Sequence, residues 1–390
     1  MTPAASDARP GVLGRLAGWY FFYFAFVGAF APYFTLYLKD IGQSAWEIGV
    51  LMSVPQVMRL LAPNLWGWLA DHLGRRALIV RIAALCSVLG FAGFFFTRDY
   101  APMLGAMALV WFFWSAALPL VEAMTLDRLA GRTERYGRVR VWGSVGFIAS
   151  VLAVGALLDH LPIATVLWAC LLILGCVFAS AVSLPETKVS SGGTAEPLGA
   201  VLRRPEVLAL LAACFFMSVA HGPLYIFLSI HLDGLGYDKT AIGLYWSLGV
   251  VAEIFVFLFM PRLMRHVSLR GILLASFALA VLRFLLIGWA AGSPALLFIA
   301  QTLHAATFGA YHAAAVAVLT RWFAPGQQAR MQGLYGSLSF GAGGLVGGLM
   351  SGQSWDALGP GMTYSLGALC AGIGWLLVWR WLSSESLASR

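Results

Sequence analysis

Arg59, Glu253 and Arg283 are charged side chains that lie deep inside long apolar segments of this 390-residue sequence. Glu253 lies about 13 residues into its segment, which is roughly 20 Å at 1.5 Å per residue of helix, and Arg283 lies at a comparable depth in the next segment. A charged side chain at the centre of a bilayer costs about 2.5–3.5 kcal/mol on insertion scales, so it normally faces a cavity and has a partner. A carboxylate in an apolar cavity holds a proton more tightly than in water, whereas a nearby arginine favours the ionised form. Such a pair has the chemistry to take up and release a proton, although a set of structural salt bridges between helices would place the same residue types there.

Polar and aromatic residues on the same segments are candidates for binding a solute. Gln56 and Arg59 share one helical face, and Trp246 shares a face with Glu253. A basic side chain beside aromatic rings suits an anionic or polar aromatic compound, whose carboxylate would pair with Arg59 or Arg283. The predicted substrate-binding residues are Arg59, Gln56, Tyr23, Trp142, His221, Tyr225, Trp246, Gln301 and Phe308.

Two further features have alternative interpretations. His304, Phe308 and His312 share a face at i, i+4, i+8, which indicates a stripe lining a cavity, although membrane histidines also serve as packing residues. Glu122 is a second membrane acid, and it is either functional or a partner of the inner-loop arginines, especially Arg138 or Arg140. The spacing of these residues fits no metal-ligand set, so we expect neither a metal nor a cofactor, with protons as the coupling ion.

The elements that must position these residues are long apolar helices. The chain is 60% hydrophobic and 11% charged, with a mean hydropathy of +0.82, whereas soluble domains are about half apolar and a quarter charged. This composition excludes a soluble enzyme, a secreted disulfide scaffold and a disordered chain. Since about 20 apolar residues cross a bilayer, twelve apolar segments predict an all-α polytopic membrane protein with twelve transmembrane helices. The segments are 17–38, 46–69, 77–97, 102–126, 138–158, 162–184, 206–232, 240–262, 270–290, 294–318, 329–350 and 360–382.

Loop charges and an internal repeat predict the arrangement of these helices. With the N-terminus inside, 20 Lys and Arg residues face the cytoplasm and three face outward, as the positive-inside rule requires. Leu38–Gly42 returns as Leu232–Gly236 at an offset of 194, and Trp142–Phe147 returns as Tyr335–Phe340 at an offset of 193. A parallel repeat of six helices is typical of transporters that bind their solute between two halves. The predicted parts are an N-terminal six-helix half at 1–184, a cytoplasmic linker at 185–205 and a C-terminal six-helix half at 206–390.

The loop after the second segment carries a motif. Its residues are Gly67, Asp71, Gly74, Arg75 and Arg76. This pattern resembles Gly-x-x-x-Asp-Arg-x-Gly-Arg-Arg of the major facilitator superfamily, except that His72 replaces the first Arg. The resemblance implies the major facilitator fold and a conformational latch at this loop, with a weaker basic side at His72.

Three longer stretches, Tyr136–Ser144, Gly243–Glu253 and Gln301–Phe308, resemble the phenylpropionate-permease branch, which is similar in layout to the lactose and nucleoside proton symporters. Lactose-type symporters carry an acid, an Arg and a His in the eighth, ninth and tenth spans as their coupling cluster. The resemblance therefore implies a proton-coupling role for Glu253, Arg283 and His304. Those permeases also place a carboxylate one turn after the His, where this sequence has Thr307. Glu253 is thus expected to be the leading proton carrier, with His304 assisting.

Together these observations predict a secondary transporter, not an enzyme. We expect proton-coupled uptake of a small organic solute, such as an aromatic carboxylate, by alternating access. The alternatives are a nucleoside or sugar proton symporter, or a metabolite or drug exporter of the same fold. The net charge of +8 is spread over short loops and does not indicate nucleic-acid binding. We expect a monomer among membrane lipids, in a bacterial inner membrane, with both termini cytoplasmic.

Overall fold

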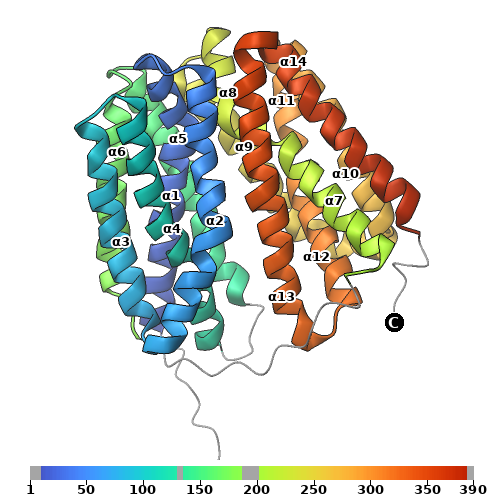
Figure 1. The fold of residues 1–390 in the computed structure, drawn as a ribbon, viewed down its shortest axis with the longest axis horizontal. Helices are drawn as coiled ribbons and strands as arrows, with labels where there is room; N and C mark the ends of the chain where they lie inside the picture. The colour runs from blue at the N-terminus through green and yellow to red at the C-terminus, as the bar shows by residue number, and fades with distance from the viewer. Residues whose placement is uncertain (1–9, 130–134, 187–201, 384–390) are drawn as a thin grey trace, which may run out of the picture. The chain divides into compact units, whose positions relative to one another are not determined.

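The computed structural model describes residues 10–129, 135–186 and 202–383, and these residues form helices joined by short turns, without a strand (Figure 1). In the first part of the chain the helices are α1 (Pro10–Asp40), α2 (Ala45–Leu73), α3 (Arg76–Ala92), the short η1 (Gly93–Phe95), α4 (Tyr100–Leu129), α5 (Tyr136–Leu158) and α6 (Thr165–Val182). In the second part they are α7 (Pro205–Ala220), α8 (Gly222–Gly234), α9 (Lys239–His266), α10 (Leu269–Ala290), α11 (Pro294–Thr302), η3 (Ala305–Ala310), α12 (Tyr311–Trp322), α13 (Pro325–Gly336), η4 (Ser337–Gly343) and α14 (Gly344–Trp381).

Eleven helical stretches among the described residues are long and apolar enough to cross a membrane. The last of them, Arg330–Trp381, has 52 residues, which is roughly 78 Å of helix against a hydrocarbon core of about 30 Å. It is interrupted at Gly359, where φ is 80° and ψ is 170°, and Pro360 follows. This stretch therefore supplies two crossings, and the twelve predicted segments are confirmed as an all-helical membrane fold.

The first unit comprises Met1–Gln43 and Met58–Ser191. In it α1 packs along α5 (Figure 1), and two glycines of this contact allow the backbones to approach closely. A Cβ on Gly28 would lie 2.5 Å from the carbonyl oxygen of Phe147, and a Cβ on Gly146 would overlap the backbone of Phe21. Tyr33 adds a hydrogen bond from its hydroxyl to the carbonyl oxygen of Val151, at 2.7 Å.

The end of α6 is fixed by side chains from neighbouring helices. Arg81 of α3 donates to the carbonyl oxygen of Leu184 at 2.6 Å, and Arg128 of α4 donates to the carbonyl oxygen of Glu186 at 3.0 Å. The Glu186 carboxylate accepts from the backbone N–H of Ala77 at 2.9 Å, in the first turn of α3. Negative charge is favourable at a helix N-terminus, so this contact joins the end of α6 to the beginning of α3.

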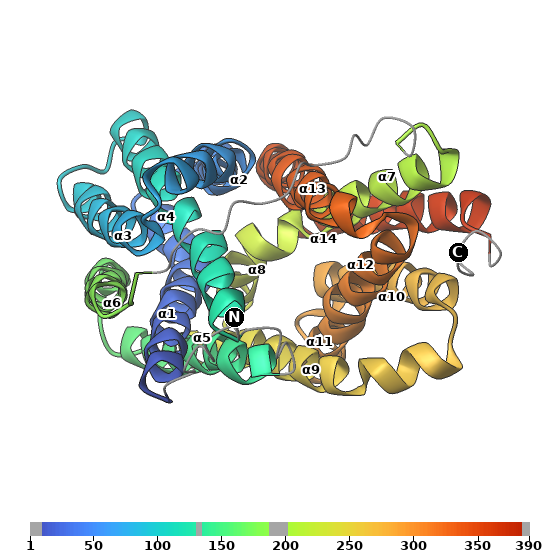
Figure 2. The same ribbon diagram turned by 90° about the horizontal axis from the view of Figure 1, so that it is seen from below.

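The second unit comprises Ser44–Val57 and Gly192–Arg390. Its centre is α14, which packs against α7, α8 and α10, and the first part of α2 also belongs to this unit. Figure 2 shows α10, α11 and α12 grouped beside one another, and α10 contacts both of the other two. The predicted division at 185–205 stays a prediction, because most of that linker, residues 187–201, lies outside the described residues.

Candidate functional site

Three ionisable side chains from consecutive segments of the second unit come together. Glu253 lies on α9, Arg283 lies on α10, and His304 lies between α11 and η3. His304 Nε2 is 3.7 Å from Glu253 Oε2, and His304 Nδ1 is 3.0 Å from Arg283 Nη1. The imidazole therefore stands between the carboxylate and the guanidinium. We refer to these three residues as the charged triad.

The contact with Arg283 determines which nitrogen of His304 carries hydrogen. A guanidinium can only donate, so His304 Nδ1 accepts and the ring N–H is on Nε2, facing Glu253. A second proton on Nδ1 would point at the guanidinium N–H, so the imidazole is neutral in this arrangement. The 3.7 Å between Nε2 and Oε2 is just beyond hydrogen-bond distance. Glu253 is thus the acid that the imidazole N–H faces.

Arg283 is only 1% exposed and makes four hydrogen bonds. Besides His304, its guanidinium donates to the carbonyl oxygen of Ala300 at 3.0 Å, to Thr307 Oγ1 at 2.9 Å and to Gln301 Oε1 at 3.0 Å. All four acceptors are neutral. The imidazole of His304 links the positive charge of Arg283 to the carboxylate of Glu253. Gln301, a predicted substrate-binding residue, is buried, and its amide oxygen is bonded to Arg283.

Two glycines leave the space in which the triad assembles. A Cβ on Gly249 would lie 3.3 Å from His304 Cδ2, and a Cβ on Gly309 would lie 3.3 Å from Glu253 Cγ. Gly309 belongs to η3, a π-helical turn that also carries Thr307. Such turns are rare and occur frequently at functional sites. Here the turn places the Thr307 hydroxyl on Arg283 one turn after His304.

The predicted stripe on the tenth segment forms a stack of rings. Phe308 lies parallel to His304, with ring centroids 5.3 Å apart, and to His312, with centroids 6.3 Å apart. His312 Nδ1 is 2.9 Å from the hydroxyl oxygen of Tyr335. The stripe therefore begins at the charged triad and ends at a histidine that is hydrogen bonded within the protein.

His221 lies at the break between α7 and α8 and is buried, with its ring edge against Phe284 at 5.1 Å. Tyr225 stacks on it at 5.7 Å and lies parallel to Trp246 at 6.4 Å. The Trp246 Nε1–H donates to Ser229 Oγ at 3.0 Å, which fixes the orientation of the indole. Three predicted substrate-binding residues thus form one row of rings in the second unit.

The remaining predicted substrate-binding residues do not join these rings. Tyr23 is buried in the first unit and stacks on Trp114 at 4.2 Å. Trp142 and Arg59 are exposed, on α5 and α2. Gln56 lies in the second unit, with its side-chain carbon Cδ 3.0 Å from where a Cβ on Gly344 would be.

Glu122 forms a separate polar cluster in the first unit. The Tyr136 hydroxyl donates to Glu122 Oε1 at 3.3 Å, and Arg140 Nε lies 3.9 Å from the same oxygen. The Arg140 guanidinium also lies 4.0 Å from the ring centroid of Phe24, a cation–π contact. In this structure, Glu122 thus pairs with Arg140, as one of the two interpretations of this acid predicts. Tyr136 and Phe24 were not predicted here, because no helical periodicity links residues on three different helices.

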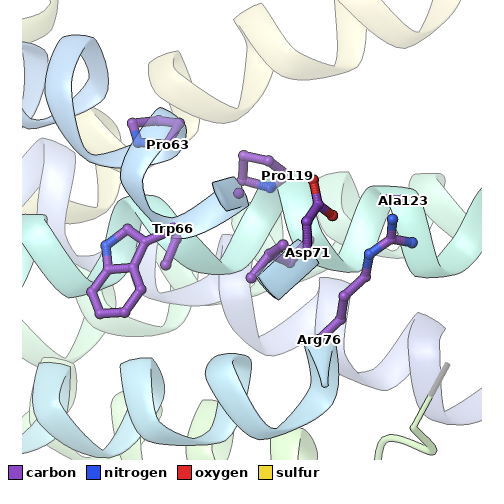
Figure 3. A pocket seen from close by; sticks show the side chains of 9 residues that line it. Pro63, Trp66, Asp71, Arg76, Pro119 and Ala123 are labelled. Carbon is purple, nitrogen blue, oxygen red and sulfur yellow. The ribbon is translucent and has the colours of Figure 1, made fainter. Parts of the chain in front are cut away.

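Three of the five predicted latch residues, Gly67, Asp71 and Arg76, line a hollow between α2 and α4 with a volume of about 210 Å³ (Figure 3). Asp71 and Arg76 lie at one end of it, and nothing lies within 4 Å of where a Cβ on Gly67 would be. Arg76 pairs with Asp127 of α4 at 2.7 Å. Gly74 adopts a φ of 63°, the left-handed region that favours glycine, and thus allows the tight turn from α2 into α3 beside the exposed Arg75.

With this geometry established, comparison with known proteins identifies the family. The sequence profile described as "MFS_1 like family" matches residues 13–366. The chain belongs to this family. It is therefore a multi-pass major facilitator transporter and not an enzyme.

Several relatives of this family member cover nearly its whole length. It is 29% identical to the "Probable 3-phenylpropionic acid transporter" of Escherichia coli (strain K12), over 89% of this chain and 92% of that protein. It is 27% identical to the "Maltose permease" of Geobacillus stearothermophilus, over 92% of each chain. The crystal structure of nucleoside transporter NupG is similar in fold, with a TM-score of 0.82, 15% identity and coverage of 96% of this chain and 99% of that one.

Proposed function

We propose that this transporter couples proton entry to the uptake of a small organic solute, such as a phenylpropionate-like aromatic carboxylate, by alternating access. The observation that carries the proposal is the charged triad, because it joins an ionisable carboxylate to a buried guanidinium through a neutral imidazole. The name of the Escherichia coli relative supports the solute class. Glu253 is the proton carrier, and His304 and Arg283 set the conditions under which it exchanges its proton.

The coupling step follows from the charges of the triad. When Glu253 is ionised, its carboxylate is attracted to the His304 N–H and balances the charge of Arg283 through the ring. When Glu253 takes up a proton from outside, the carboxyl becomes neutral and that attraction weakens. A rearrangement that exposes the carboxyl to the cytoplasm releases the same proton inside. One proton thus crosses in each cycle without any change in the charge of Arg283.

The two arginines considered as anchors for a substrate carboxylate differ in their exposure to solvent. The Arg283 guanidinium is buried and makes four hydrogen bonds. Arg59, by contrast, is exposed on α2. In the second unit, the partly exposed rings of Tyr225 and Trp246 offer stacking surfaces for an aromatic ring. We therefore assign the carboxylate anchor to Arg59 rather than to Arg283.

The proposal includes the cellular setting. The protein acts as a monomer in a bacterial inner membrane, with both termini in the cytoplasm and protons as its coupling ion. The excess of Lys and Arg in the loops assigned to the cytoplasm supports this orientation. A nucleoside or sugar proton symporter is the second candidate, and the names of the maltose permease and of the nucleoside transporter structure favour it.

Proton entry into proteoliposomes loaded with the pH dye pyranine tests the proposal. Adding 3-phenylpropionate outside should acidify the interior faster than in protein-free liposomes. The protein-free control is essential because the neutral acid crosses lipid unaided. An excess of proton entry that saturates with 3-phenylpropionate is the expected result. Equal rates with and without protein would contradict this solute, and uridine and maltose would then test the second candidate.

A further inference from the structure

Beside the charged triad lies a buried histidine nitrogen without a hydrogen-bond partner among the described residues. The nitrogen is Nε2 of His221, a residue that is 4% exposed, and it has no hydrogen-bond partner among the described residues. Buried polar atoms are nearly always hydrogen bonded, because an unpaired one has lost its water without replacement. This nitrogen therefore indicates a partner that the protein itself does not supply.

The opposite nitrogen of the same ring determines what that partner must be. His221 Nδ1 lies 2.8 Å from the carbonyl oxygen of Met217. A carbonyl oxygen only accepts, so Nδ1 carries the hydrogen and donates it. In the neutral ring Nε2 then has a lone pair and no hydrogen. The missing partner is a hydrogen-bond donor.

The surroundings of His221 are suited to an aromatic ligand. Its ring stacks on Tyr225, which is 37% exposed, and Tyr225 lies parallel to Trp246. His304 of the charged triad lies on another side, with ring centroids 6.5 Å apart. The His221 ring thus neighbours both an exposed aromatic side chain and a residue of the charged triad.

We propose that His221 Nε2 accepts a hydrogen bond from a hydroxyl or N–H group of the transported solute. The inference rests on the function proposed above and narrows its substrate class. The solute is an aromatic carboxylate that also carries a donor, as in a hydroxyphenylpropionate, rather than an unsubstituted phenylpropionate. A solute without the donor leaves Nε2 buried and unpaired, and it binds more weakly for that reason.

The test compares ligands that differ only in the donor. Binding to the purified full chain is measured by titration calorimetry with the three positional isomers of hydroxyphenylpropionate, their methoxy counterparts and 3-phenylpropionate. The methoxy compounds keep the ring, the carboxylate and the oxygen but cannot donate. We expect at least one hydroxy isomer to bind about tenfold more tightly than its methoxy counterpart, as one well-placed hydrogen bond provides.

Variants assign this preference to one nitrogen. His221→Phe removes the acceptor and should abolish the tenfold preference, whereas His221→Gln retains an acceptor oxygen and should keep part of it. The matched control is His231→Phe in the adjoining helix α8, because His231 Nε2 is already 3.0 Å from the carbonyl oxygen of Ile287. The control should keep the wild-type preference.

The possible outcomes separate the two proposals. Equal affinities for hydroxy and methoxy compounds, or a preference that survives in His221→Phe, would overturn the role of His221 while leaving aromatic-acid transport in place. Absence of binding and of proton entry with every aromatic acid would overturn both. A hydroxyl preference in the wild type that only His221→Phe loses supports the inference without relying on the stability of a single variant.

Discussion

At the scale of single residues, the two nitrogens of His304 have different partners and different consequences. Nδ1 accepts a hydrogen bond from Arg283, while Nε2 faces Glu253 at 3.7 Å. The first contact supports a buried charge, and the second links that charge to the acid. Because the two contacts use different atoms of the ring, they can be removed separately.

Two amide variants of His304 separate these contacts. His304→Asn places an oxygen near the position of Nδ1, so Arg283 keeps an acceptor but the link to Glu253 is lost. We expect a melting temperature close to the wild type and loss of substrate-driven proton entry. His304→Gln reaches the position of Nε2 and removes the Nδ1 acceptor, which leaves a buried donor unpaired at a cost of about 1–3 kcal/mol. We expect this variant to melt at a lower temperature.

Melting of the detergent-purified variants and pyranine assays on the same preparations check this pair. If His304→Asn and His304→Gln changed the melting temperature equally, the assignment of Nδ1 as the acceptor for Arg283 would be wrong. If His304→Asn kept full proton entry, the imidazole would have no part in coupling.

Residue types and depth singled out Glu253 and Arg283, because a membrane charge is costly and needs a partner. The resemblance to the lactose-type symporters added His304 to them. The arrangement around Arg283 was not predictable in the same way. Its bonds to Gln301, Thr307 and a backbone carbonyl depend on the π-helical turn η3, for which the local sequence Ala305–Ala310 has no distinctive residue pattern. Gln301 was expected to contact substrate, and its side chain is instead bonded to the guanidinium in this structure.

At the scale of helices, the contact of α1 with α5 depends on glycines at the crossing. A Cβ on Gly146 would overlap the carbonyl group of Phe21 and lie 2.9 Å from its Cα. Backbone atoms of a packed helix cannot rotate aside as a side chain can. The helices would have to separate along their length to accommodate even one methyl group.

Gly146→Ala is therefore expected to lower the melting temperature of the protein, or its yield in the membrane, despite the higher helix propensity of alanine. Gly175→Ala in α6 is the matched control, because nothing lies within 4 Å of where its Cβ would be. The control should melt at or slightly above the wild-type temperature, since alanine is favoured over glycine in helices by about 0.8–1.0 kcal/mol. Thermal melting of both variants in one detergent makes the comparison. Equal stability of the two variants would show that the α1–α5 contact is looser than the structure indicates.

The apolar segments predicted where most helices begin and end, because hydrophobic length is set by the bilayer. Interruptions within a segment were harder to predict. The segment 206–232 was expected to be one helix, and the structure divides it at His221 into α7 and α8. Gly222 and Pro223 are the local signal for this break, since proline lacks a backbone N–H. The sequence did separate the last two segments correctly, at the Gly359–Pro360 interruption of α14.

At the scale of the whole molecule, a coupled transporter must bind proton and solute together and must not carry either alone. The internal repeat and the apolar segments predicted the family fold, because both are properties of the whole chain. We propose that a few side chains such as His221 and Arg59 set the identity of the solute, and composition carries no information on it. The proposed coupling likewise depends on one carboxylate, Glu253, together with its two neighbours, which composition also does not reveal.

The most direct measurement is made on Glu253→Gln, which keeps the shape of the side chain and fixes it in a neutral state. The variant is compared with the wild type in proteoliposomes, using radiolabelled solute in two assays: accumulation driven by an imposed pH gradient, and exchange of solute at equal pH. Glu206→Gln, which removes an acid in the first turn of α7 outside the triad, is the control. The account predicts that Glu253→Gln exchanges solute but no longer accumulates it, while the control does both. Accumulation by Glu253→Gln against a solute gradient would contradict the central claim, because the proton would then be carried elsewhere.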